Sequence, residues 1–173
     1  MTTNYRDVPE LQKYIDLVEN EGKNGVKKCC KWQKKLIKFV KKCFENENLT
    51  IDTEQLKKYM GLQKYFDFEL FEWEQFVFTL HCCVFREDGL PRFPDLLIFV
   101  ARGAGKNGYL AFEDFALLTP VNGIREYNID IFANSEDQAK TTFKDVYNIL
   151  EDGSIKLEKH FYWNLEVIRN KKP

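Results

Sequence analysis

The sequence has no long apolar run and no hydrophobic segment at its N-terminus. The longest apolar stretch, near Phe76 to Phe85, contains His81 and is much shorter than the roughly 20 residues that a transmembrane helix needs. We therefore expect an intracellular protein that does not associate with a membrane.

Cysteine pairs at a metal-binding spacing are also absent. The five cysteines form two adjacent pairs and one singleton, without any Cys-x-x-Cys, so we expect no zinc site. His81 precedes Cys82 and Cys83, but no other ligand is near in the sequence, and helix packing explains all three residues. We expect reduced thiols that serve mainly as packing groups.

An excess of charge of one sign is missing as well. The 26 Lys and Arg residues balance 27 Asp and Glu residues, for a net charge of −1, so global charge does not indicate nucleic-acid binding. Aromatic residues, in contrast, make up 15% of the chain and hydrophobic residues 44%, which excludes general disorder. The 173 residues suffice for one domain with an appended helical region.

A glycine-rich turn lies between an apolar run and a helical pattern. Leu96 to Ala101 is short and apolar, which predicts a buried strand, and apolar residues from Leu110 onward recur at helical spacing. Gly103 and Gly105 allow a tight turn whose backbone N–H groups can hold phosphate at a helix N-terminus. Lys106 would reach the β- and γ-phosphates, as in a P-loop. The predicted ATP-binding residues are Arg102, Gly103, Ala104, Gly105, Lys106 and Asn107.

Two positions depart from the general P-loop pattern G-x-x-x-x-G-K-[ST]. Val100 stands at the first glycine position and Asn107 at the hydroxyl position. The amide oxygen of Asn107 could lie near Mg²⁺, but a neutral carbonyl differs from the usual hydroxyl and could weaken or reposition the ion. The alternative is an ordinary glycine turn with an exposed lysine. The order of strand, turn and helix favours the nucleotide site.

The first part of the chain has helical patterns. We expect helices from Pro9 to Glu19, from Val26 to Asn46, and from Asp52 or Thr53 to Met60, followed by an extended connection from Gln63 to Leu70. In the second of these helices, the predicted packing stripe contains Cys29, Trp32, Leu36, Val40 and Cys43.

The opposite face of that second helix is rich in lysine. Lys27, Lys31, Lys34 and Lys38 are candidates for contacts with nucleic-acid phosphates. A solvated helix face is the favoured alternative, because the aromatic residues are predicted on the packing side and not among the lysines.

A mostly buried helix is expected from Phe71 to Phe85, with Trp73 and Gln75 near its start. The Trp73 ring could stack on the adenine base, and the Gln75 amide could pair with both a donor and an acceptor of that base. Core packing explains Trp73 equally well, and a solvent-facing position is the alternative for Gln75.

The pattern after the turn is that of an α/β protein. A second strand is expected to begin near Tyr127, and Ser135 with Gln138 forms a capping box that opens a helix to about Leu150. Another strand is expected to start at Phe161. Strands that alternate with helices predict a P-loop NTPase-type parallel sheet with crossover helices, preceded by an α-helical N-terminal region. The predicted division is a helical region over 1–70 and the front part of an ATPase domain over 71–173.

Three segments of the chain resemble the ATPase domain of tailed-phage terminase large subunits. They are Val100-Ala-Arg-Gly-Ala-Gly-Lys-Asn-Gly-Tyr-Leu-Ala111, Ile129-Asp-Ile-Phe-Ala-Asn-Ser-Glu-Asp-Gln-Ala139 and Leu70-Phe-Glu-Trp-Glu-Gln-Phe76. The resemblance implies that Lys106 and the turn from Arg102 to Asn107 bind the phosphates of ATP with Mg²⁺, and that Trp73 and Gln75 lie in the adenine-contacting segment. Arg102 matches the family's P-loop arginine, whose guanidinium can neutralise charge on the transferring phosphoryl group.

The same resemblance implies a motor that hydrolyses ATP to drive double-stranded DNA into a capsid, in the cytoplasm of an infected or lysogenic bacterial host. Its partners would be double-stranded DNA, a terminase small subunit, the capsid portal and further copies of the same chain. We find no acidic magnesium strand and no nuclease carboxylate cluster, so the sequence looks like the front part of a longer protein. Such a fragment would hydrolyse ATP hardly at all, because metal and water are left unpositioned.

Two other functional classes remain open. Another P-loop NTPase would also use Lys106 but should carry a strand-borne acidic pair. A non-catalytic assembly module would use the lysine-rich helix and would be indifferent to the loss of Lys106.

Overall fold

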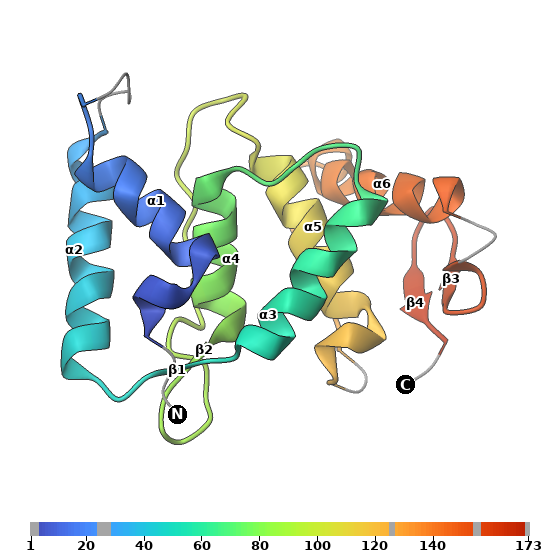
Figure 1. Cartoon of the computed structure of the whole chain (residues 1–173). Helices are drawn as coiled ribbons and strands as arrows, with labels where there is room; N and C mark the ends of the chain where they lie inside the picture. Colours follow the sequence, from blue (N-terminus) through green and yellow to red (C-terminus); the bar gives the residue numbers. More distant parts are fainter. Residues whose placement is uncertain (1–3, 24–28, 125–126, 154–156, 172–173) are drawn as a thin grey trace. The chain divides into compact units, whose positions relative to one another are not determined.

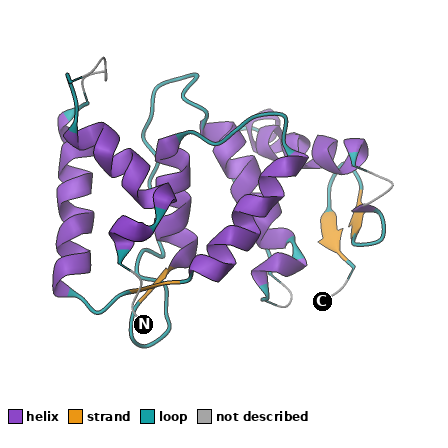
Figure 2. Cartoon of the chain, viewed as in Figure 1, coloured by secondary structure: helices purple, strands orange, loops and turns teal. Residues whose placement is uncertain are grey.

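The computed structural model describes residues 4–23, 29–124, 127–153 and 157–171 (Figure 1). Figure 2 shows that helices predominate and that the strands of these residues are short. The chain forms two compact units. Unit 1 comprises Met1–Leu56 and Phe71–Leu97, and unit 2 comprises Lys57–Leu70 and Ile98–Pro173. The positions of the units relative to one another are not determined, and the division predicted at residues 70 and 71 stays a prediction.

Unit 1 is built from helices and one small antiparallel sheet. Its elements are η1 (Tyr5–Asp7), α1 (Pro9–Glu19), α2 (Lys31–Asn46), β1 (Thr50–Ile51), the start of α3 (Thr53–Met60), α4 (Glu72–Cys83) and β2 (Val84–Phe85). In Figure 1, α1 lies between α2 and α4, and it packs against both. Leu11, Ile15 and Val18 recur at helical spacing on α1, and all three are buried. The Tyr14 ring lies 5.0 Å from the Phe76 ring, between centroids.

Unit 2 is organised around α5 and α6, which pack against each other. Its elements are the end of α3, η2 (Gly61–Tyr65), α5 (Lys106–Leu118), η3 (Pro120–Asn122), α6 (Glu136–Asp152), β3 (Phe161–Trp163) and β4 (Ile168–Asn170). β3 and β4 pair antiparallel, with Tyr162 opposite Arg169. The amide Nδ2 of Asn170 donates to the Leu118 carbonyl at 3.2 Å, which ties this hairpin to the end of α5.

The prediction of a P-loop NTPase-type parallel sheet is wrong. The described residues contain two antiparallel sheets of two strands each, and neither includes Leu96 to Ala101 or the segment from Tyr127. The expected buried strand is instead open to solvent, since Leu97 is 92% exposed and Phe99 is 98% exposed. An apolar run indicates an extended segment, but a strand exists only where a neighbouring strand accepts and donates its hydrogen bonds. Phe161 does begin a strand, but its partner is the antiparallel β4.

Most of the predicted helices are confirmed, but the helix expected from Phe71 to Phe85 is shorter, since α4 ends at Cys83 and Val84 and Phe85 form β2. α1 has the predicted bounds and begins with Pro9 in its first turn. Asp52 caps α3 by accepting from the backbone N–H of Gln55 at 2.8 Å. Ser135 caps α6 by accepting from the N–H of Gln138 at 3.4 Å, and the helix stops at Gly153. The extended connection predicted from Gln63 is wrong over its first residues, which belong to η2.

The second predicted helix differs from α2 in its start and in its packing stripe. It was expected from Val26, but Cys29 and Cys30 are not helical and α2 begins at Lys31, so Cys29 does not belong to the stripe. Val40 and Cys43 are buried as expected, together with Ile37. Trp32 and Leu36 were expected on the same side, yet they are 63% and 37% exposed. Helical periodicity places an apolar arc on the helix, but the neighbouring helices decide how much of that arc they cover. None of the helices in the described ranges is long and apolar enough to cross a membrane.

Candidate phosphate-binding turn

The glycine-rich turn of unit 2 leads directly into α5. Gly103 and Gly105 have φ angles of 82° and 90°, in the left-handed region that residues with a β-carbon rarely adopt. The N–H of Ala104 donates to the Ala101 carbonyl at 3.2 Å, which closes the turn, and α5 begins at Lys106. The predicted order of turn and helix is therefore confirmed, but the residues directly before the turn, Leu96 to Ala101, form no strand.

The start of α5 has free hydrogen-bonding capacity. The first N–H groups of any α-helix have no acceptor within the helix, and the cap residue Gly105 supplies no side chain that could accept from them. No acidic residue lies in the first turn. The N-terminal end of the helix dipole and the Lys106 ammonium therefore act together at this turn to favour an anion.

The predicted phosphate ligands are accessible in this turn. Arg102, Lys106 and Asn107 are exposed, and Lys106 Nζ donates to Asn107 Oδ1 at 3.3 Å. The turn thus brings together the two cations and the one amide that the sequence predicts for phosphate and Mg²⁺. The sequence predicts that Asn107 contacts Mg²⁺. Among the described residues, no group of three His, Cys, Asp or Glu side chains could hold a metal ion.

A contact that the sequence analysis missed supports the first turn of α5. A β-carbon placed on Gly108 would lie 3.1 Å from Cζ of Phe68, so a larger residue here would require the ring to shift by a few tenths of an ångström. Farther along α5, Phe112 and Phe115 pack on Phe66, with ring centroids 5.4 and 5.7 Å apart. Two features of the sequence were available as signals for this contact. They are Gly108, directly after Lys106 and Asn107, and the aromatic residues before residue 70.

The residues predicted to contact adenine belong to the other unit. Trp73 and Gln75 lie in the first two turns of α4, and both are partly buried. Unit 1 contains these residues and unit 2 contains the turn. Their role at the base therefore stays a prediction.

The predicted nucleic-acid ligands occupy different environments on α2. Lys34 forms an ion pair with Glu21, whereas Lys31 lies over the Trp32 ring, with Nζ 5.3 Å from its centroid. Lys38 is exposed. Lys27 lies outside the described residues.

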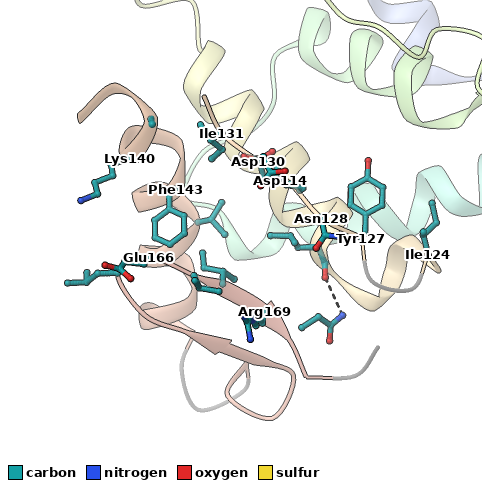
Figure 3. Close-up of a pocket in the computed structure, with 18 of the residues that line it drawn as sticks. Asp114, Ile124, Tyr127, Asn128, Asp130, Ile131, Lys140, Phe143, Glu166 and Arg169 are labelled. Atoms are coloured by element: carbon teal, nitrogen blue, oxygen red, sulfur yellow. Dashed lines mark hydrogen bonds between the residues drawn. The ribbon is translucent and has the colours of Figure 1, made fainter. Parts of the chain in front are cut away.

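A cavity of about 1070 Å³ lies in unit 2 (Figure 3). Its lining includes Asp114 of α5, Phe143 of α6, Arg169 of β4, and Tyr127, which lies between η3 and α6. Burial raises the pKa of the Asp114 carboxyl to about 7, and the neighbouring Glu113 contributes in the same direction. Asp114 follows Lys106 by eight residues, or about 12 Å along the helix axis. None of the residues from Arg102 to Asn107 lines the cavity, which is therefore separate from the turn.

Comparisons of the chain with protein-family models, with curated proteins and with solved structures gave no significant match. The similarity to terminase large subunits therefore rests on the residue motifs alone.

Proposed function

We propose that the turn from Arg102 to Asn107 binds the phosphates of ATP, and that the chain is the ATP-binding part of a terminase-type DNA-packaging motor. The observation that carries ATP binding is the conformation of the turn. Two glycines with positive φ precede a helix of 13 residues whose first side chain is the exposed Lys106. The assignment to a packaging motor depends on the sequence motifs around this turn.

The chemistry of the turn suits a polyphosphate. Backbone N–H groups at the start of α5 would donate to phosphate oxygens, and Lys106 would add a point charge. Arg102 carries a planar guanidinium that can donate two parallel hydrogen bonds to a phosphate. Asn107 would supply a neutral oxygen to Mg²⁺ bound with the nucleotide. All of these groups would therefore contact the phosphates or the Mg²⁺ ion, and none of them would contact the adenine base.

Binding without appreciable turnover is the expected behaviour of this chain. Hydrolysis requires a carboxylate that positions Mg²⁺ and the attacking water, and the described residues hold no acidic cluster able to take a metal ion. In a terminase-type motor, hydrolysis would be coupled to the movement of double-stranded DNA.

Calorimetric titration with Mg²⁺ and ATP tests this proposal. We expect saturable binding that Lys106→Ala weakens by about tenfold or more, because a hydrogen bond to a charged group contributes about 1.5–3 kcal/mol. Lys144→Ala is the matched control, since Lys144 is also exposed and lies on α6 of the same unit. Far-ultraviolet circular dichroism should be unchanged in both variants. Equal binding by Lys106→Ala and the parent chain, or no binding by the parent chain, would contradict the proposal.

A further inference from the structure

The outward side of α2 carries an apolar stripe that unit 1 leaves open. Trp32, Leu36 and Phe39 are 63%, 37% and 51% exposed, and their spacing of four and three residues places them on one side of the helix. They are distinct from Ile37, Val40 and Cys43, which fill the core. We name Trp32, Leu36 and Phe39 the α2 stripe. It spans about 10 Å, or two helical turns.

Lysines border the α2 stripe along one edge. Lys31, Lys35, Lys38 and Lys42 are exposed, and the structure gives none of them a carboxylate partner among the described residues. Nζ of Lys35 lies 4.6 Å from the Trp32 ring centroid. In contrast, Lys34 and Lys41, on the side toward α1, pair with Glu21 and Glu19. Of the six lysines of α2, two thus form ion pairs within unit 1. The other four have no carboxylate partner among the described residues and lie beside exposed apolar side chains.

One ring of the stripe is already held in place. Phe39 meets Phe93 edge to face, with ring centroids 6.4 Å apart, and Arg92, next to Phe93, binds Glu47 just beyond the end of α2. A side chain that is fixed before binding loses little conformational entropy when a partner covers it.

We propose that the α2 stripe and its four lysines form a docking surface for an acidic amphipathic α-helix of a partner protein. Such a helix would present Leu, Ile or Met at three- and four-residue spacing, flanked by Glu or Asp. Its apolar side chains would cover Trp32 and Phe39, as in other complexes in which a helix binds a hydrophobic surface. Its carboxylates would meet the unpaired ammonium groups, which favours this charge pattern over others.

Other partners fit this surface less well. A DNA duplex would contact the lysines through its phosphates, but it would leave the rings of Trp32 and Phe39 in water. A second copy of the chain that used the same face would bring lysines opposite lysines, which is repulsive. All residues of this surface belong to unit 1, so the inference does not depend on ATP binding by the turn in unit 2.

Fluorescence anisotropy with a labelled synthetic peptide tests the proposal. The probe is a helical peptide of about 18 residues, or five turns, with Leu at three- and four-residue spacing and Glu at the flanking positions. We expect binding to the parent chain with a dissociation constant in the micromolar range, weakened by rising salt. Trp32→Ala, Phe39→Ala and Lys35→Glu should each weaken binding by about tenfold.

Matched variants separate this surface from general effects of charge and hydrophobicity. Lys13→Glu makes the same charge change at an exposed position of α1, and Leu90→Ala removes an exposed apolar side chain that is 54% accessible. Both should bind the peptide like the parent chain. Equal weakening by Lys13→Glu and Lys35→Glu would overturn the proposal, as would the absence of saturable binding. Binding of a duplex of about 20 base pairs that depends on Lys35 but not on Trp32, without peptide binding, would replace it with a nucleic-acid surface.

Discussion

The ring of Phe68 lies against the backbone of Gly108, so close that a β-carbon at position 108 would be 3.1 Å from Phe68 Cζ. Gly108 is in the first turn of α5, directly after Lys106 and Asn107. Alanine is favoured over glycine inside a helix by about 1 kcal/mol, but here the added methyl group must displace the ring. These two effects oppose each other in Gly108→Ala.

A double-mutant cycle measures this contact. We expect Gly108→Ala alone to change the free energy of unfolding little, and Gly108→Ala in a Phe68→Ala background to stabilise by nearly the full helix propensity. The coupling between the two sites should be about 0.5–1 kcal/mol. Urea denaturation of the four proteins gives this number. Additive effects of the two substitutions would show that the ring does not restrict Gly108.

The buried side chain of Glu74 makes the stability of the folded state depend on pH. Its side chain is 2% exposed, one carboxylate oxygen accepts from the Phe71 N–H at 2.8 Å, and the other has no hydrogen-bond partner. Burial raises the pKa of the Glu74 carboxyl to about 7, against a smaller lowering by the Phe71 N–H. The folded state therefore binds the proton more tightly than the unfolded state. This contribution to stability is complete below the ordinary glutamate pKa of about 4.3 and is lost as pH rises through about 7.

Glu74→Gln should consequently stabilise the protein at high pH. We expect a gain of about 1–3 kcal/mol at about pH 8 that shrinks toward zero near pH 5. Thermal or urea denaturation at both pH values measures the difference. Glu72→Gln, an exposed neighbour in the same helical turn, is the control and should show no comparable change between the two pH values. An equal effect of Glu74→Gln at both pH values would contradict a buried, readily protonated carboxyl.

Asp114 should titrate far above the ordinary range of an aspartate. Burial beside the cavity, followed by the charge of Glu113, raises its pKa to about 7. Carbon-detected NMR of the side-chain carboxyl, assigned by its disappearance in Asp114→Asn, should give a midpoint near 7. A midpoint near 4, the ordinary value, would mean that water enters the cavity and solvates this carboxylate fully.

The ion pair between Arg92 and Glu47 depends on the planar guanidinium. Arg92 Nη2 donates to Glu47 Oε1 at 2.7 Å, and Arg92 Nε donates to Glu47 Oε2. Lysine cannot reproduce two parallel hydrogen bonds. Arg92→Lys should lower the free energy of unfolding by about 0.5–1 kcal/mol at low salt and by less at high salt. Arg86→Lys, at the exposed pair with Asp88, should have no measurable effect, and equal effects of both substitutions would contradict this prediction.

The candidate turn could be found from the sequence because its determinants are local. Gly103 and Gly105 permit the left-handed backbone, and the apolar spacing from Leu110 predicts a helix behind them. The contact between Phe68 and Gly108 could not be found in this way, because it joins residues 40 positions apart. Nor does any local pattern place Trp73 or Gln75 relative to Lys106.

The sequence by itself determined most of the helices and those of their ends that carry local signals, but not the start of α2 at Lys31 or the end of α4 at Cys83. Pro9, Asp52, Ser135 and Gly153 act on the backbone within a few residues, so capping and termination do not need the rest of the fold. Tertiary structure alone decided which extended segments became strands. The run from Leu96 to Ala101 has strand-like composition, but hydrogen bonds between strands need a partner at the right distance. Tertiary structure also decided that Ile37 of α2 is buried while Trp32 is exposed, because the packing of α1 covers only part of the apolar arc that the helical period creates.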